Sequence, residues 1–241
     1  RFYNFLEVAA KPDSHFIAWY LPEINEREPD FLLFSESLGL IIFGVKDWAI
    51  DQILEANATH FALNKGGRTE YLKNPFRQAR NYYGAVADKI REDGCLISRE
   101  RHAYGNPKIP ICYGVVFPNI QRLDYLRRDY DKVISADKIF FLDDLRPDSD
   151  LCADKSGKQF LETIKRMFVP QFAFKISGKE LNHLRQLLFP MVKVDLPIRE
   201  RHACYEENIR RLKVLDQNQE RIARKCESGH RIVIGPSGTG K

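Results

Sequence analysis

The segment EPDFLLFSESLGLIIFGVKDW, residues 28–48, decides the fold. Two nearly continuous apolar runs flank the short polar break SES, which predicts a β-hairpin. Because neither run alternates with polar residues, we expect the sheet to be covered on both faces. Asp30 begins the first strand and Lys46 ends the second, and the ends of an antiparallel hairpin opposite its turn come together. Asp30 and Lys46 are therefore expected to meet at one edge of the sheet.

A carboxylate and an ammonium group at the rim of a sheet suit phosphodiester hydrolysis. A carboxylate binds Mg²⁺, which lowers the pKa of a bound water and screens the phosphate. The lysine positions or polarises the water and offsets charge in the transition state. The arrangement resembles the P-D…(D/E)-x-K signature of a large nuclease superfamily, with Pro29 and Asp30 as its first half and Lys46 as its last residue. The resemblance implies that Asp30 holds Mg²⁺ or Mn²⁺ and that the fold is restriction-endonuclease-like.

Gly44 occupies the position of the second acid in this signature, two residues before the lysine. Glycine has no side chain to bind a metal, and inside a strand it lowers stability. Three explanations remain open: the acid was removed to make an inactive variant, the domain is naturally degenerate and binds DNA without cutting it, or a nearby acid replaces it. The candidates for a replacement are Glu36, Asp47 and Asp51. We favour the first two explanations over the third.

The segment NPFRQARNYYGAVADKIRE, residues 74–92, predicts a helix with one apolar stripe and a proline in its first turn. Gln78 and Tyr82 are four residues apart, on one face. A Q-x-x-x-Y pair after the hairpin resembles RecB-type nucleases of the same superfamily, where it helps to hold substrate or active-site groups. The alternative is that Tyr82, which borders the apolar stripe, only packs. Basic residues near this face are candidates for DNA phosphate contacts, or else form a solvated surface: Lys73, Arg77 and Arg80.

The order of these segments is similar to that of the nuclease-related domain known as NERD, of the same superfamily. The resemblance rests on the hairpin and on NPFRQARNYY, ICYGVVFP and DDL, and it covers roughly residues 1–145. NERD domains usually carry Glu where this chain has Gly44, and an acid on the first helix, for which Glu7 is the candidate here. They are often fused to superfamily-one helicases, which bears on the end of the chain.

The last residues, HRIVIGPSGTGK, contain a candidate phosphate-binding loop. GPSGTGK matches G-x-x-x-x-G-K and follows the short apolar strand RIVI, the context that this motif requires. Its glycines let backbone N–H groups turn toward phosphate oxygens, and its lysine adds a positive charge at the outer phosphates. A glycine-rich turn that matches by chance is the alternative, which the strand context disfavours. The candidate ATP-binding residues are Gly235, Gly238, Gly240 and Lys241.

The segment LDQNQERIA, residues 215–223, precedes this loop. It resembles the entry to the first motor domain of superfamily-one DNA helicases of the UvrD and Rep type, in which a glutamine contacts the adenine. The matching residue is Gln219, although Asp216 and Gln219 also fit an N-cap pair. The distance of Gln219 from the loop favours the adenine contact. The resemblance implies an ATP-dependent helicase of which this sequence holds only the beginning.

We therefore expect three regions in the 241 residues. A NERD-like α/β domain with a mixed sheet flanked by helices occupies residues 1–147, and a helical linker region occupies residues 148–212. The first strand and phosphate loop of a RecA-like motor domain occupy residues 213–241. The polar segment DSDLCADKSGK, residues 148–158, marks the first boundary.

Composition bounds the partners and the location. No apolar run is long enough to cross a bilayer, so we expect no membrane span, and no segment resembles a signal peptide. The net charge of +5 permits a polyanionic partner without requiring one. Five cysteines without a C-x-x-C pair indicate reduced thiols in a cytoplasmic protein, and the spacing of cysteines and histidines does not predict a zinc site.

Together these patterns predict a metal-dependent DNA nuclease module, impaired by Gly44, coupled to an ATP-dependent DNA helicase. Such a fusion suits DNA processing, repair or defence against phage DNA. The alternative is a non-cleaving DNA-binding or assembly module attached to a helicase, which Gly44 itself supports. A plain ATPase with a scaffolding N-terminal domain is a third reading. The sequence carries no signal for the oligomeric state.

Overall fold

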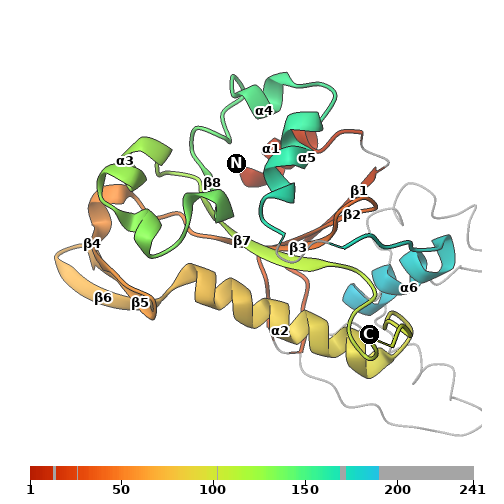
Figure 1. The fold of residues 1–241 in the computed structure, drawn as a ribbon. Coiled ribbons are helices and arrows are strands. Elements are labelled where there is room, and N and C mark those ends of the chain that lie inside the picture. The colour runs from red at the N-terminus through yellow and green to blue at the C-terminus, as the bar shows by residue number, and fades with distance from the viewer. Residues whose placement is uncertain (13–14, 26, 102, 169–171, 190–241) are drawn as a thin grey trace, which may run out of the picture. The chain divides into compact units, whose positions relative to one another are not determined.

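The computed structural model describes residues 1–12, 15–25, 27–101, 103–168 and 172–189. Residues 1–184 form one compact unit. A mixed sheet at its centre has the strand order β1-β2-β3-β7-β8, and it confirms the predicted α/β class (Figure 1). Its strands are Phe16–Tyr20, Phe31–Ser35, Gly39–Val45, Ile111–Phe117 and Ile139–Phe141. The first three pair antiparallel, whereas β7 pairs parallel with both β3 and β8.

The predicted hairpin is confirmed in strands β2 and β3. Phe31 pairs with Phe43 and Ser35 with Gly39, so the polar break forms the turn. All five residues of β2 are buried, as are six of the seven in β3. The expectation that this part of the sheet is covered on both faces is therefore confirmed.

Helices cover the two faces of the sheet (Figure 1). Helices α1 (Phe2–Ala9), α4 (Asp150–Ala153) and α5 (Lys158–Lys165) lie on one side, and α2 (Pro75–Asp93) lies on the other. On the first side, neighbouring aromatic rings join α1, the sheet and α5 in one core: Phe2, Phe5, Phe31, Phe43, Phe140 and Phe160. Because side chains alternate along a strand, the neighbours of Phe43 in sequence, Ile42 and Gly44, face α2.

Helix α2 is defined at both ends by its sequence. The side chain of Asn74 accepts hydrogen bonds from the backbone N–H groups of Phe76 and Arg77, and Pro75 occupies the first turn. Gly94 ends the helix in the left-handed conformation, at φ 76°. The buried residues form the predicted stripe and pack the helix on β3 and β7: Ala79, Val86, Ala87 and Ile90.

A second, three-stranded sheet follows the hairpin. It consists of β4 (Ile53–Ala56), β5 (His60–Lys65) and β6 (Arg68–Lys73), in that order. Its apolar face packs with α3 (Arg122–Arg127) and with the 3₁₀ turns η2 (Ile50–Gln52), η3 (Tyr130–Lys132) and η4 (Ala136–Lys138) around a separate core. The buried aromatic residues of this core are Trp48, Phe61, Phe117, Tyr125 and Phe141.

The predicted division after residue 147 does not coincide with a break in packing. Phe160 and Ile164 of α5 belong to the same core as Phe5 and Phe140, and the compact unit continues to Leu184. A capping box starts α6 (Gly178–Leu188): the Glu180 carboxylate accepts from Ser177 N–H, and Ser177 Oγ accepts from Glu180 N–H.

The rest of the predicted linker and the predicted motor segment, with Gln219, Gly235, Gly238, Gly240 and Lys241, lie outside the described residues. Among the helices that the structure describes, none is long and apolar enough to span a bilayer.

Two glycines of β3 should respond in opposite ways to alanine. A Cβ at Gly44 would meet only Asp30 Oδ2, at 3.9 Å, and Gly44 has no left-handed φ. Gly44→Ala should raise the free energy of unfolding by about 0.5–1 kcal/mol, because glycine is the costlier residue to order in a strand. A Cβ at Gly39 would collide with the Pro110 carbonyl, and Gly39 has φ 103°.

Gly39→Ala should therefore lower the free energy of unfolding by roughly 2 kcal/mol or more. Urea unfolding of the three proteins measures both changes. Equal destabilisation by the two substitutions would contradict the described environment of Gly44.

The start of α6 should lose protection in acid. Lys108 Nζ lies 2.6 Å from Glu180 Oε1, and the hydrogen bonds from Lys108 and from Ser177 lower the pKa of Glu180 to about 2 from an ordinary 4.5. Because the pKa is lower in the folded state, this stabilisation is present above about pH 4.5 and is lost as the pH falls toward 2. Amide hydrogen exchange of residues 181–184 should accelerate over that range, after correction for the intrinsic rate.

Glu180→Gln is the matched control for this measurement, because glutamine keeps the capping-box geometry but cannot titrate. Its residues 181–184 should be less protected at pH 5 and should depend less on pH below it. Identical pH profiles in the two proteins would refute the assignment to Glu180.

Candidate functional site

Asp30 lies directly before β2 and opposite the end of β3. The register that pairs Phe31 with Phe43 places Asp30 across from Gly44. Asp30 Oδ2 accepts a hydrogen bond of 2.7 Å from the backbone N–H of Val45, and the Asp30 carbonyl accepts from Leu21 N–H at 3.1 Å. The carboxylate thus satisfies a backbone donor where the hairpin ladder ends. Its second oxygen, Oδ1, has the lone pairs with which a carboxylate can bind a cation.

Gly44 is buried, but the fold does not require glycine there. Among the residues that the structure describes, an added Cβ would have one heavy atom within 4 Å, Asp30 Oδ2 at 3.9 Å, which is an ordinary van der Waals distance. A longer side chain at this position would leave the strand on the face that Asp30 shares. An acidic residue in place of Gly44 would therefore bring a second carboxylate next to that of Asp30.

Lys46 follows β3 and is half-buried. Its backbone N–H donates to the Val116 carbonyl at 2.9 Å, which extends the parallel pairing with β7 by one residue. Alternation along the strand places Lys46 on the same face as Gly44, about 7 Å further along the chain direction. The hairpin thus carries Asp30 and Lys46 at the same end and on the same face.

Gln78 and Tyr82 face this end of the hairpin from helix α2. Gln78 Nε2 donates to Tyr82 Oη at 2.7 Å. Burial raises the pKa of Tyr82, the hydrogen bond from Gln78 opposes this rise, and the charge of Asp30 adds to it. Tyr82 therefore lies within electrostatic reach of Asp30, and the pair closes the candidate site from the helical side.

Two charged residues of this site carry no motif and were missed in the sequence. Arg27 lowers and Glu28 raises the pKa of Tyr82, after the larger effects of burial, Gln78 and Asp30. Extending the register of the hairpin places Glu28 opposite Lys46. Both Arg27 and Glu28 are exposed. Alternation from Asp30 back along the chain could have indicated Glu28 but not Arg27.

The candidate replacement acids differ in position. Glu36 lies in the turn between β2 and β3, at the far end of the hairpin from Asp30, so it is wrong as a replacement. Asp47 and Asp51 are exposed, in the segment after Lys46 and in η2. Glu7 is exposed on α1, and α1 packs on the face of the sheet opposite to that of Asp30 and Gly44.

The three basic residues predicted to contact DNA are all exposed, and Arg77 and Arg80, three residues apart, lie on the same side of α2. Lys73 ends strand β6, and Arg77 lies in the first turn of α2. Arg80 is two residues beyond Gln78, roughly 200° around the helix axis. It lines a large cavity on the other flank of α2 together with Tyr83 and Tyr113.

Comparisons of the chain with models of protein families, with curated protein sequences and with solved structures give no match.

The proximity of Asp30 and Tyr82 has a direct test. Asp30→Asn removes a negative charge but keeps an oxygen that can accept from Val45 N–H. Because the charge of Asp30 raises the pKa of Tyr82, the Asn variant should titrate Tyr82 at a lower pH. Spectrophotometric titration of tyrosinate, with Tyr82→Phe subtracted to isolate the single residue, measures the shift. Glu36→Gln, at the other end of the hairpin, should leave the titration unchanged; an equal shift in both variants would refute the local effect.

Proposed function

We propose that residues 1–147 are a nuclease-type DNA-processing module of the NERD kind, in the P-D…(D/E)-x-K superfamily. We further propose that it acts with the superfamily-one helicase whose phosphate loop begins at Gly235. The observation that supports the module most is the pairing of Asp30 with Gly44 across the hairpin, with Lys46 two residues beyond on the same face. The nuclease signature requires an acid, a second acid and a lysine in this relation.

The residues present fit a divalent cation in part. Mg²⁺ in proteins is commonly bound by one or two carboxylates together with waters and substrate phosphates, and Asp30 supplies one carboxylate held on a rigid strand end. When bound, the cation would supply Lewis-acid stabilisation of the phosphate and a water of lowered pKa. With Gly44 in place of the second carboxylate, the affinity for the cation is reduced, and we expect cleavage to be impaired.

The other side chains have separate tasks in this proposal. Lys46 offers a positive charge to the scissile phosphate and orients the attacking water. The hydrogen-bonded pair of Gln78 and Tyr82 restricts the site from the helical side and can contact the sugar–phosphate backbone. Exposed Arg77 and Lys73 can add salt-dependent phosphate contacts near the start of α2.

A non-cleaving DNA-binding module is the second candidate function. The buried Gly44 favours it, because one carboxylate is missing from the group that holds the cation. In this case Asp30 is a structural acceptor for Val45 N–H, and the site retains only its contacts with the DNA backbone.

Restoring the second acid is the decisive experiment. Gly44→Glu should cleave DNA in Mn²⁺ or Mg²⁺ at least roughly 100-fold faster than the unchanged chain, because it adds a carboxylate directly opposite Asp30. Gly44→Gln has the same size without the charge and should not gain activity. Agarose-gel assays on supercoiled and linear DNA measure the cleavage, and calorimetry with Mn²⁺ alone measures cation binding.

Two outcomes separate the candidate functions. If Gly44→Glu cleaves and the double variant Gly44→Glu/Asp30→Ala does not, the nuclease proposal is supported. If no variant cleaves with any divalent cation while the unchanged chain binds DNA with an affinity that falls with salt, the nuclease proposal fails and the non-cleaving module is favoured.

A further inference from the structure

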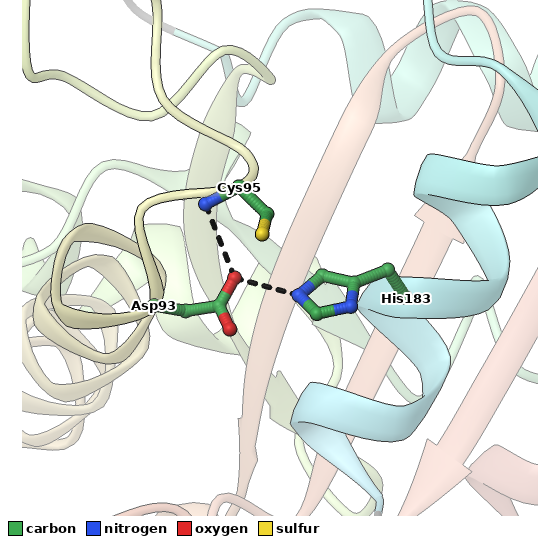
Figure 2. A group of neighbouring side chains, drawn as sticks. All are labelled: Asp93, Cys95 and His183. Carbon is green, nitrogen blue, oxygen red and sulfur yellow. Dashed lines mark hydrogen bonds and ion pairs between the residues drawn. The ribbon is translucent and has the colours of Figure 1, made fainter.

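A second group of potential ligands lies at the opposite end of α2. Asp93 is the last residue of that helix, Cys95 follows the glycine that caps it, and His183 comes from α6. One ligand atom from each of these side chains lies within 4.8 Å of the others. Figure 2 shows the sulfur of Cys95 pointing toward the contact between Asp93 and His183.

Hydrogen bonds already orient this group. Asp93 Oδ1 accepts from the backbone N–H of Cys95 at 3.2 Å and from His183 Nε2 at 2.6 Å. The left-handed conformation of Gly94, which only glycine adopts without strain, turns the chain back so that Cys95 lies beside Asp93. The arrangement therefore depends on the C-cap of α2.

Contacts outside these three residues also hold helix α6 in place. Glu180 binds Lys108 at 2.6 Å and completes the capping box with Ser177. Glu180 and His183 are three residues apart, so they lie on the same side of the helix. Fixing Glu180 thus presents His183 to Asp93, and Leu184 next to it is fully buried.

The donor set selects the kind of cation. A carboxylate oxygen, an imidazole nitrogen and a thiolate sulfur are the three ligand types that Zn²⁺ takes in proteins, whereas Mg²⁺ and Ca²⁺ prefer oxygen ligands alone. With metal–ligand bonds of about 2.0–2.3 Å, tetrahedral ligand atoms are roughly 3.3–3.8 Å apart. The ligand atoms of the three side chains lie within 4.8 Å of one another, and the side chains of Asp93 and His183, 21% and 36% exposed, are not locked in a packed core.

A cysteine nucleophile is the competing reading of the same residues. In that arrangement an imidazole lies between the thiol and the acid and draws the proton from sulfur. Here the acid lies in the middle instead: Asp93 accepts from the backbone N–H of Cys95 and from His183 Nε2. Because the imidazole does not lie between the thiol and the acid, the geometry disfavours a cysteine nucleophile.

We propose that Asp93, Cys95 and His183 form a Zn²⁺ site that fastens helix α6 to the end of helix α2. Zn²⁺ replaces the thiol proton of Cys95, which leaves to solvent. The proton on His183 Nε2 moves by way of solvent to Nδ1, so that Nε2 can bind the metal, and water takes the fourth position. The site does not depend on the proposed nuclease function, because its residues are separate from Asp30, Gly44 and Lys46.

The test uses the full 241-residue chain, freed of metal with a chelator and titrated with Zn²⁺ and with Co²⁺. Residues outside the described part also include cysteine and histidine, so the readout is the difference between variants. Cys95→Ser and His183→Gln should each lose one Zn²⁺ equivalent by metal analysis, with affinity at that site falling roughly 100-fold or more. Glutamine can still donate to Asp93, so His183→Gln keeps the contact that fixes α6.

Cys152→Ser is the matched control, because Cys152 is another free and partly exposed thiol, on α4. Cys152→Ser should retain the bound Zn²⁺ equivalent that Cys95→Ser loses. It should also retain the Co²⁺–thiolate absorption that Cys95→Ser loses. Circular dichroism of the metal-free proteins verifies that the variants fold.

Each outcome decides the proposal. Loss of the same equivalent in both Cys95→Ser and His183→Gln supports it. Unchanged stoichiometry in both, or loss in only one of them, overturns the three-ligand site. Asp93 and His183 would in that case form an ion pair alone.

Discussion

Strand β3 is hydrogen-bonded along both edges and covered on both faces, and the candidate nuclease-like site depends on this constraint. It pairs antiparallel with β2 and parallel with β7, while aromatic rings of α1 cover one face and α2 the other. Each large apolar side chain buried in this way contributes about 1.5–3 kcal/mol. A register slip of one residue would turn the whole set to the wrong faces, so the pairing is strongly specified.

The fixed register gives Asp30 two properties that are hard to separate. Its carboxylate closes the hydrogen-bond ladder through Val45, and it lies on the face where Gly44, Lys46 and Tyr82 converge. A carboxylate that accepts a hydrogen bond from the backbone is held in a fixed position. A catalytic or metal-binding group at a strand end requires such rigid positioning. The same contact means that loss of Asp30 affects both the stability of the hairpin and any reaction there.

Local patterns in the sequence predict the local structure well. The hairpin at residues 28–48 and helix α2 both follow from short-range spacing, and each is confirmed. The parallel pairing of β3 with β7 and the separate sheet of β4 to β6 depend on contacts between distant segments, which hydrophobic periodicity does not encode. Glu36 is excluded by the hairpin itself, because the polar break that contains it forms the turn at the end opposite Asp30. The spacing of Cys95 and His183 in the sequence matches no metal-binding motif, because only the folded chain brings the two residues together.

Helix α2 connects the two candidate sites as a spacer of fixed length. Its 19 residues correspond to about 28 Å, and Gln78 lies near one end while Asp93 lies at the other. At physiological ionic strength, exposed charges further apart than about 8–10 Å are largely shielded by mobile ions. A change of charge at one end of the helix therefore has little electrostatic effect at the other end. Any coupling between the two ends requires a displacement of the helix itself.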